Sequence, residues 1–117
     1  MIYNFTVYEN FAELLESDGG TAKLLLKELG INNPDTDKRL WMSDRLYVYP
    51  NIHNYCVYEL IDGWRYNYRL SGGFNDSPNP VNYIDTIALG VNLIDLGSSK
   101  FCRLLPNGKV VTTDYEW

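Results

Sequence analysis

Hydrophobic and polar positions alternate most clearly over residues 55–70, YCVYELIDGWRYNYRL, on either side of Asp62-Gly63. Asp-Gly between two runs of β-branched and aromatic residues indicates a β-hairpin, because both residues tolerate a positive φ. The pattern therefore predicts two antiparallel strands joined by a two-residue loop.

Directly opposed residues of such a hairpin share one face. We expect Trp64 and Tyr68 to be buried on an aromatic face, and Arg65 and Arg69 to be more exposed on an amphipathic one. Glu59 falls on the aromatic face, where a carboxyl must be hydrogen-bonded or neutral unless that face is partly exposed. The aromatic face comprises Tyr55, Val57, Glu59, Ile61, Trp64, Tyr66, Tyr68 and Leu70, and the other face comprises Cys56, Tyr58, Leu60, Arg65, Asn67 and Arg69.

Two helices are predicted near the N-terminus. Asn10 followed by Glu13 is typical of a capping box, and the helix after it has Phe11, Leu14 and Leu15 on its apolar side. A second helix is expected over residues 22–29, with Thr21 as its N-cap and Gly30 after its last residue.

A third helix is predicted where apolar residues recur at helical spacing over residues 84–94, with Gly97 after it. A strand over residues 87–93 stays an alternative, because Gly90 lowers the helix propensity of this segment. Asn79 followed by Pro80 is a candidate start for the helix.

The remaining strands are expected over residues 46–49 and in a hairpin over 100–115 around Pro106-Asn107-Gly108, and residues 2–8 form either a first strand or an extended lead-in. The register of this last hairpin stays open, because loops of two and of three residues place opposite side chains on each face. Together these elements predict a single α+β domain over residues 1–117, with an antiparallel sheet of four to six strands and two or three helices packed on one face.

Composition narrows the class of protein. The chain has 117 residues, of which 45% are hydrophobic and 15% aromatic, and its net charge is −5. Nucleic-acid-binding proteins usually carry a basic surface, so direct binding of nucleic acid is not expected. No apolar run approaches the roughly 20 residues of a membrane span, and we expect a cytoplasmic protein with Cys56 and Cys102 reduced.

Few residues combine into a catalytic or metal-binding motif. His53 and Cys56 with Cys102 supply at most three zinc ligands, one fewer than a structural site needs. The same residues make a weak Cys–His nucleophile, because three-residue spacing on a strand directs His53 and Cys56 to opposite faces. Residues 33–44 resemble a calcium loop, yet Lys38 occupies the position that requires glycine. The sequence thus predicts no enzyme, with no catalytic residue, cofactor or metal.

The function that we expect is that of a small acidic, non-catalytic protein-binding module. Proteins of this type act as stoichiometric inhibitors or immunity proteins by covering a basic surface of a partner, such as one that binds nucleic acid. The alternatives are a small enzyme or ligand-binding module with a Tyr/Trp-lined pocket, and a DNA-binding regulator with a helix-turn-helix formed by residues 22–31 and 35–45. The candidate partner-binding residues are Glu9, Glu13, Glu16, Asp18, Tyr58, Arg65 and Arg69.

Overall fold

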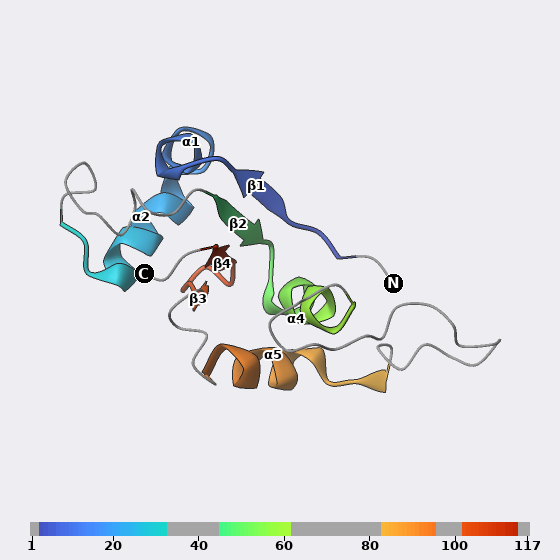
Figure 1. The fold of residues 1–117 in the computed structure, drawn as a ribbon. Helices are drawn as coiled ribbons and strands as arrows, with labels where there is room; N and C mark the ends of the chain where they lie inside the picture. Colours follow the sequence, from blue (N-terminus) through green and yellow to red (C-terminus); the bar gives the residue numbers. More distant parts are fainter. Residues whose placement is uncertain (1–2, 33–44, 62–82, 96–101, 115–117) are drawn as a thin grey trace.

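A four-stranded antiparallel sheet forms the centre of the computed structural model, which describes residues 3–32, 45–61, 83–95 and 102–114 (Figure 1). The strands are β1 (Thr6–Tyr8), β2 (Leu46–Tyr49), β3 (Cys102–Leu104) and β4 (Val110–Thr113), in the order β1-β2-β4-β3. The helices are α1 (Phe11–Ser17), α2 (Gly19–Leu29), α4 (Ile52–Ile61) and α5 (Thr86–Asp95). The α+β class and the antiparallel sheet are confirmed, while the described residues contain four helices instead of two or three.

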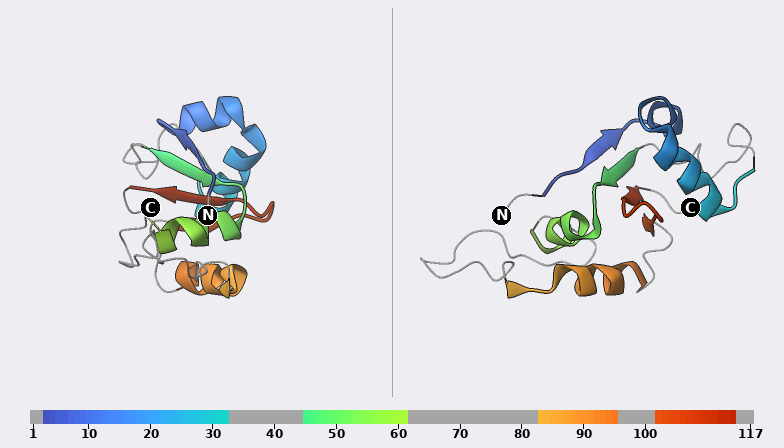
Figure 2. Two further views of the ribbon diagram at one scale, coloured as in Figure 1. Left: turned by 90° about the vertical axis from the view of Figure 1, so that its right-hand side faces the viewer. Right: turned by 180° about the vertical axis from the view of Figure 1, so that it is seen from behind.

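The helices cover both faces of the sheet, whereas we had predicted them on one. Helices α1 and α2 lie on one side and α4 and α5 on the other (Figure 2). Successive side chains of a strand point to opposite faces, so Leu46 and Val48 contact the first pair of helices and Tyr49 contacts the second. Both faces are buried because the strand is hydrophobic at every position.

Capping determines how the first two helices begin and end. The side chain of Asn10 accepts a hydrogen bond from the Glu13 backbone N–H (2.9 Å), as predicted. The N-cap of α2 is Asp18 instead of Thr21, since its carboxylate accepts hydrogen bonds from both the backbone N–H and the hydroxyl of Thr21. Gly30 follows α2 with φ 68°, the left-handed conformation expected at a helix end.

The predicted hairpin over residues 55–70 is wrong in its first half, because Ile52–Ile61 is α-helix. Asn51 starts this helix by accepting a hydrogen bond from the Asn54 backbone N–H (2.9 Å). The helix lies between the sheet and α5, so most of its circumference is buried and its apolar residues show no clear helical period. The second half, with Trp64, Arg65, Tyr68 and Arg69, lies outside the described residues.

Helix α5 resolves the alternative of helix or strand that the sequence left open for residues 87–93. Residues 86–95 form a helix, and Asp85 starts it by accepting a hydrogen bond from the Ala88 backbone N–H (3.0 Å). Gly90 faces Ile52 of α4 so closely that an added Cβ would lie 2.7 Å from Cγ1 of that side chain. The glycine thus serves helix packing instead of indicating a strand.

The hairpin of β3 and β4 has the three-residue loop. The Leu105 backbone N–H donates to the Lys109 carbonyl (2.9 Å), and residues 106–108 form the loop between them. Gly108 has φ 87°, which a glycine adopts without strain. The register places Cys102 opposite Thr112, and Leu104 opposite Val110.

Candidate functional site

Aromatic rings from β2, α4 and the residues before β1 gather on the sheet face that α4 covers. Tyr47 and Tyr49 share this face because they are two residues apart in β2, and Phe5 precedes the neighbouring strand β1. Tyr58 extends from α4 toward them, with its ring centroid 5.6 Å from that of Tyr49 and 6.1 Å from that of Phe5. Tyr3 stacks on Phe5 at 5.9 Å, so the cluster continues toward the N-terminus.

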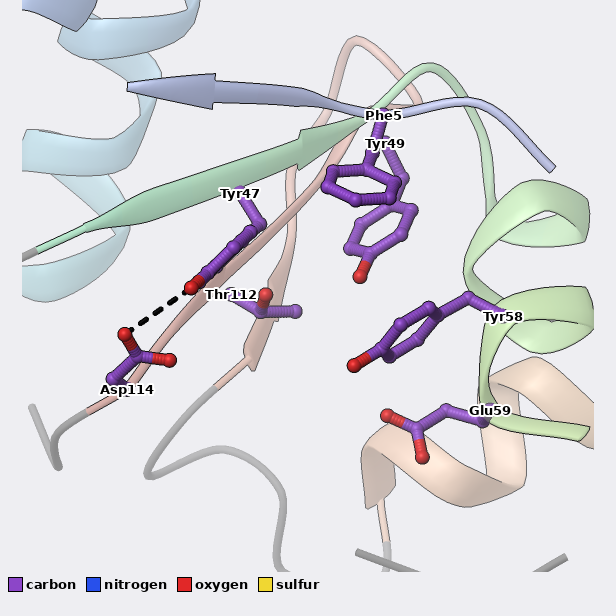
Figure 3. A pocket seen from close by; sticks show the side chains of 7 residues that line it. All are labelled: Phe5, Tyr47, Tyr49, Tyr58, Glu59, Thr112 and Asp114. Atoms are coloured by element: carbon purple, nitrogen blue, oxygen red, sulfur yellow. Dashed lines mark hydrogen bonds between the residues drawn. The ribbon is translucent and has the colours of Figure 1, made fainter. Parts of the chain in front are cut away.

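A cavity of about 100 Å³ opens between these rings and the end of β4 (Figure 3). Two carboxyl groups contribute to its wall, Glu59 from α4 and Asp114 directly after β4. Figure 3 shows Asp114 beside Tyr47, and Glu59 beside Tyr58. The complete lining consists of Phe5, Tyr47, Tyr49, Tyr58, Glu59, Thr112 and Asp114.

The two carboxyl groups differ in their surroundings. Asp114 is exposed and accepts a hydrogen bond from the Tyr47 hydroxyl (3.2 Å). Glu59 is buried, with only 1% of its surface exposed. The cavity therefore has one acidic group near solvent and one in its interior.

Burial keeps the phenol groups protonated. It raises the pKa of Tyr49 well above its ordinary value, and the neighbouring Tyr58 and Glu59 raise it further. Burial also raises the pKa of Tyr47, with a further contribution from the charge of Asp114. Both hydroxyls are neutral hydrogen-bonding groups at neutral pH, as ordinary phenols are, and the raised pKa values extend this to more alkaline pH.

One cation lies close to the edge of the cavity. The Arg45 guanidinium contacts the carboxylate of Glu9, with Nε 3.5 Å from Oε2. Its pKa is raised, first by a hydrogen bond with Tyr47 and then by the charge of Glu9, with Asp114 contributing least. Glu9, Arg45, Tyr47 and Asp114 thus form a chain of polar contacts across the edge of the site.

The predicted partner-binding residues that the structure describes lie on both sides of the sheet. Tyr58 lines the cavity, whereas Glu13 and Glu16 belong to α1 on the opposite side of the sheet. Glu13 is occupied in capping, since its carboxylate accepts from the Glu9 backbone N–H (2.6 Å). Arg65 and Arg69 lie outside the described residues.

Asp18 has a structural role that the sequence did not indicate. The Lys109 ammonium lies 2.6 Å from its Oδ2, next to the hydrogen bond from Thr21. These two contacts, with the hydrogen bond donated by Lys109 as the larger cause, lower the pKa of Asp18. Residues 1–20 contain four acidic residues and no Lys or Arg. The fold brings Lys109 to Asp18, as it brings Arg45 to Glu9.

Sequence reasoning missed most of the cavity residues. The alternation of Tyr47 and Tyr49 places both on one face, and Glu59 stood out as a carboxyl among apolar neighbours. Thr112 and Asp114 gave no such indication, because they reach the site only through the pairing of β4 with β2.

His53 and Cys56 lie on a helix instead of a predicted strand, whereas Cys102 lies in a strand of the last hairpin, as predicted. His53 and Cys56 lie one turn apart on α4 instead of on opposite faces of a strand, and His53 Nδ1 is 2.6 Å from the Thr86 hydroxyl. Cys56 and Cys102 are buried and free. Burial, with a further contribution from Glu59, raises the pKa of Cys56 to about 11, so this thiol stays protonated at neutral pH.

Within the described ranges, no three His, Cys, Asp or Glu side chains gather as a metal site, and no helix is both long and apolar enough to cross a membrane. Residues 33–44, which resemble a calcium loop, lie outside the described ranges. Of residues 35–45, which would complete a helix-turn-helix, the structure describes only Arg45. No protein-family model, curated protein or solved structure matches the chain.

Proposed function

We propose that the protein is a non-catalytic binding module for a basic surface of a partner protein, of the stoichiometric inhibitor or immunity type. The observation that carries this proposal is the small aromatic cavity with Glu59 and Asp114 in its wall. Aromatic side chains are enriched at protein interfaces, and carboxylates beside them complement a positively charged partner.

The size of the cavity favours a protein partner over a metabolite. Pockets for small molecules usually measure about 300–1,000 Å³. The cavity here measures about 100 Å³, which suits a single side chain or a few water molecules. This observation weighs against the alternative of a ligand-binding module or small enzyme built around a Tyr-lined pocket.

The charge of the chain supports the same proposal. A net charge of −5 attracts a basic surface and repels nucleic acid. Glu16 on α1 is exposed and adds to this field, although it lies on the other side of the sheet. Such long-range attraction raises the association rate and is screened within about 10 Å at 0.1 M salt.

The test begins with isolation of the partner from the native host and continues with association kinetics over a range of salt concentrations. We expect a one-to-one complex whose association rate falls as salt rises. Glu16→Lys and Asp95→Lys should each slow association, because both exposed residues contribute to the negative charge that attracts the partner. An association rate that is independent of salt refutes the proposal.

We also propose that the protein acts in the cytoplasm. Cys56 and Cys102 are both free, which fits a compartment where thiols stay reduced. Fractionation of the host cell with an antibody to the protein tests this location.

A further inference from the structure

The aromatic cavity combines the two groups that recognise an organic cation. Aromatic rings attract a cation placed over their faces, and carboxylates accept its hydrogen bonds. Tyr58 supplies a half-buried ring from α4, while Asp114 supplies an exposed carboxylate at the other side of the cavity. Glu59 adds a second carboxyl group in the interior.

We propose that this cavity receives one lysine or arginine side chain of the partner protein, as the anchor of the complex. The inference rests on the proposed function and names the group that the module recognises. The alkyl part of such a side chain lies against Phe5 and the tyrosine rings, and its charged end lies between Tyr58 and Asp114. Both kinds of side chain have this form, a flexible apolar stem with a terminal cation.

The volume and the burial pattern favour an inserted side chain. A cavity of about 100 Å³ does not hold a folded segment of a partner, but it holds the end of a single long side chain. Burial strengthens the attraction between the cation and the carboxyl groups, because the local dielectric constant is lower than that of water. Binding energy in protein complexes is commonly concentrated in such anchors.

Arg45 is the cation against which the incoming group competes. It contacts Glu9 and Tyr47, and its charge opposes a second cation near Asp114. Arg45→Gln removes this repulsion and is expected to tighten cation binding several-fold. If Arg45 bound the partner directly, Arg45→Gln would instead weaken binding.

The first experiment uses the full chain and capped amino acids followed by NMR. Acetyl-arginine amide and acetyl-lysine amide should shift the backbone signals of Thr112, Asp114 and Tyr58. Acetyl-citrulline amide, which is a neutral analogue of the arginine probe, should leave them in place. Equal shifts with the citrulline probe overturn the proposal, as does an effect of the arginine and lysine probes confined to other residues.

The second experiment compares variants of the cavity. Asp114→Asn should weaken binding of the arginine probe about ten-fold, the effect of losing a hydrogen bond between charged groups. Asp95→Asn is the matched control, since it removes one negative charge from an exposed residue outside the cavity. If the two variants weaken binding equally, the attraction comes from net charge and the cavity is not the site.

Tyr58 provides the test of the ring. Tyr58→Phe keeps an aromatic face and should change the affinity by less than about two-fold, whereas Tyr58→Leu should lower it several-fold. Circular dichroism and thermal unfolding confirm that each variant folds before it is compared. Equal affinities for the two variants refute a role for the ring.

The partner complex separates this inference from the proposed function. A salt-dependent complex that is weakened by Asp114→Asn and Tyr58→Leu supports both. A salt-dependent complex that is unaffected by these substitutions leaves the proposed function standing and overturns the anchor. Binding of tetramethylammonium with no binding of the arginine and lysine probes also overturns it, because the cavity then serves a small free cation.

Discussion

Replacement of Asp18 tests the contacts that connect the start of α2 with the residue before β4. Its carboxylate accepts a hydrogen bond from the Thr21 backbone N–H (3.3 Å) at the start of α2 and lies 2.6 Å from the Lys109 ammonium, just before β4. Asp18→Ala removes both the cap and the ion pair. Asp18→Asn removes the charge alone, because asparagine is as good an N-cap as aspartate.

The two variants should differ by a measurable amount. Loss of an N-cap costs about 1 kcal/mol. The ion pair is partly exposed, with 37% of the Lys109 side chain and 27% of the Asp18 side chain accessible, so it contributes at most about 1 kcal/mol. We expect Asp18→Ala to lower the free energy of unfolding by about 2 kcal/mol and Asp18→Asn by about half of that.

The pH dependence gives the second part of the test. Lys109 and Thr21 lower the pKa of Asp18 in the folded protein, so the charged form is favoured by folding. The stability that this charge contributes is fully present above the unfolded pKa of about 3.9, and it is lost as the pH falls through the lower, folded pKa. The difference between wild type and Asp18→Asn should therefore be constant near neutral pH and vanish in acid.

Urea unfolding at several pH values, followed by circular dichroism, measures both quantities. Lys109→Met should cost the same increment as Asp18→Asn, and the double variant should cost no more than either, because both remove one ion pair. The reasoning fails if Asp18→Asn destabilises as much as Asp18→Ala at neutral pH, or if its effect persists in acid.

Three further predictions concern α4 and α5, the helices that cover one face of the sheet. Gly90→Ala should destabilise the protein by about 1–2 kcal/mol in thermal unfolding, because the clash with Ile52 exceeds the gain of about 1 kcal/mol in helix propensity; a stabilised variant contradicts the close approach of α4 and α5. Asn51→Ala should cost about 1 kcal/mol through loss of the cap of α4, and an unchanged urea midpoint contradicts this. Alkylation of Cys56 in the native protein should be slow at neutral pH and accelerate toward pH 11, and rapid modification at pH 7 excludes a buried, protonated thiol.

The elements that the sequence predicted correctly are those with clear ends. Asn10 with Glu13 begins α1, and Gly30 ends α2. Pro50 follows β2, whose four residues are all strand formers. In each case the local chemistry of a cap or a turn agrees with the tertiary structure, so no distant contact was needed.

Residues 52–61 show why the rest was not predictable. Asp62-Gly63 at the end of this segment suggested a hairpin, and the apolar residues before it fitted a strand with one buried face. The helix that forms there is buried against the sheet on one side and α5 on another, which removes the polar stripe that reveals a helix. Pro50-Asn51 before it was the one local indication of a helix start.

The candidate site was less predictable than the fold, because no local pattern assembles it. Its lining spans the chain from Phe5 to Asp114 and depends on the register between β2 and β4, which pairs Leu46 with Thr113. Register follows from the whole set of strand contacts, so the proximity of Asp114 to Tyr47 appears only in three dimensions.

The acidic residues at helix starts and in the cavity wall form two groups, and only the second group lies where the proposed partner would bind. Glu13, Asp18 and Asp85 accept hydrogen bonds from backbone N–H groups at helix starts, where a negative charge is favourable for any protein. Glu59 and Asp114 lie in the wall of one cavity. Both groups contribute equally to the net charge, but only Glu59 and Asp114 line the cavity. The positions of Glu59 and Asp114 are therefore stronger support for a basic partner than the total charge of −5.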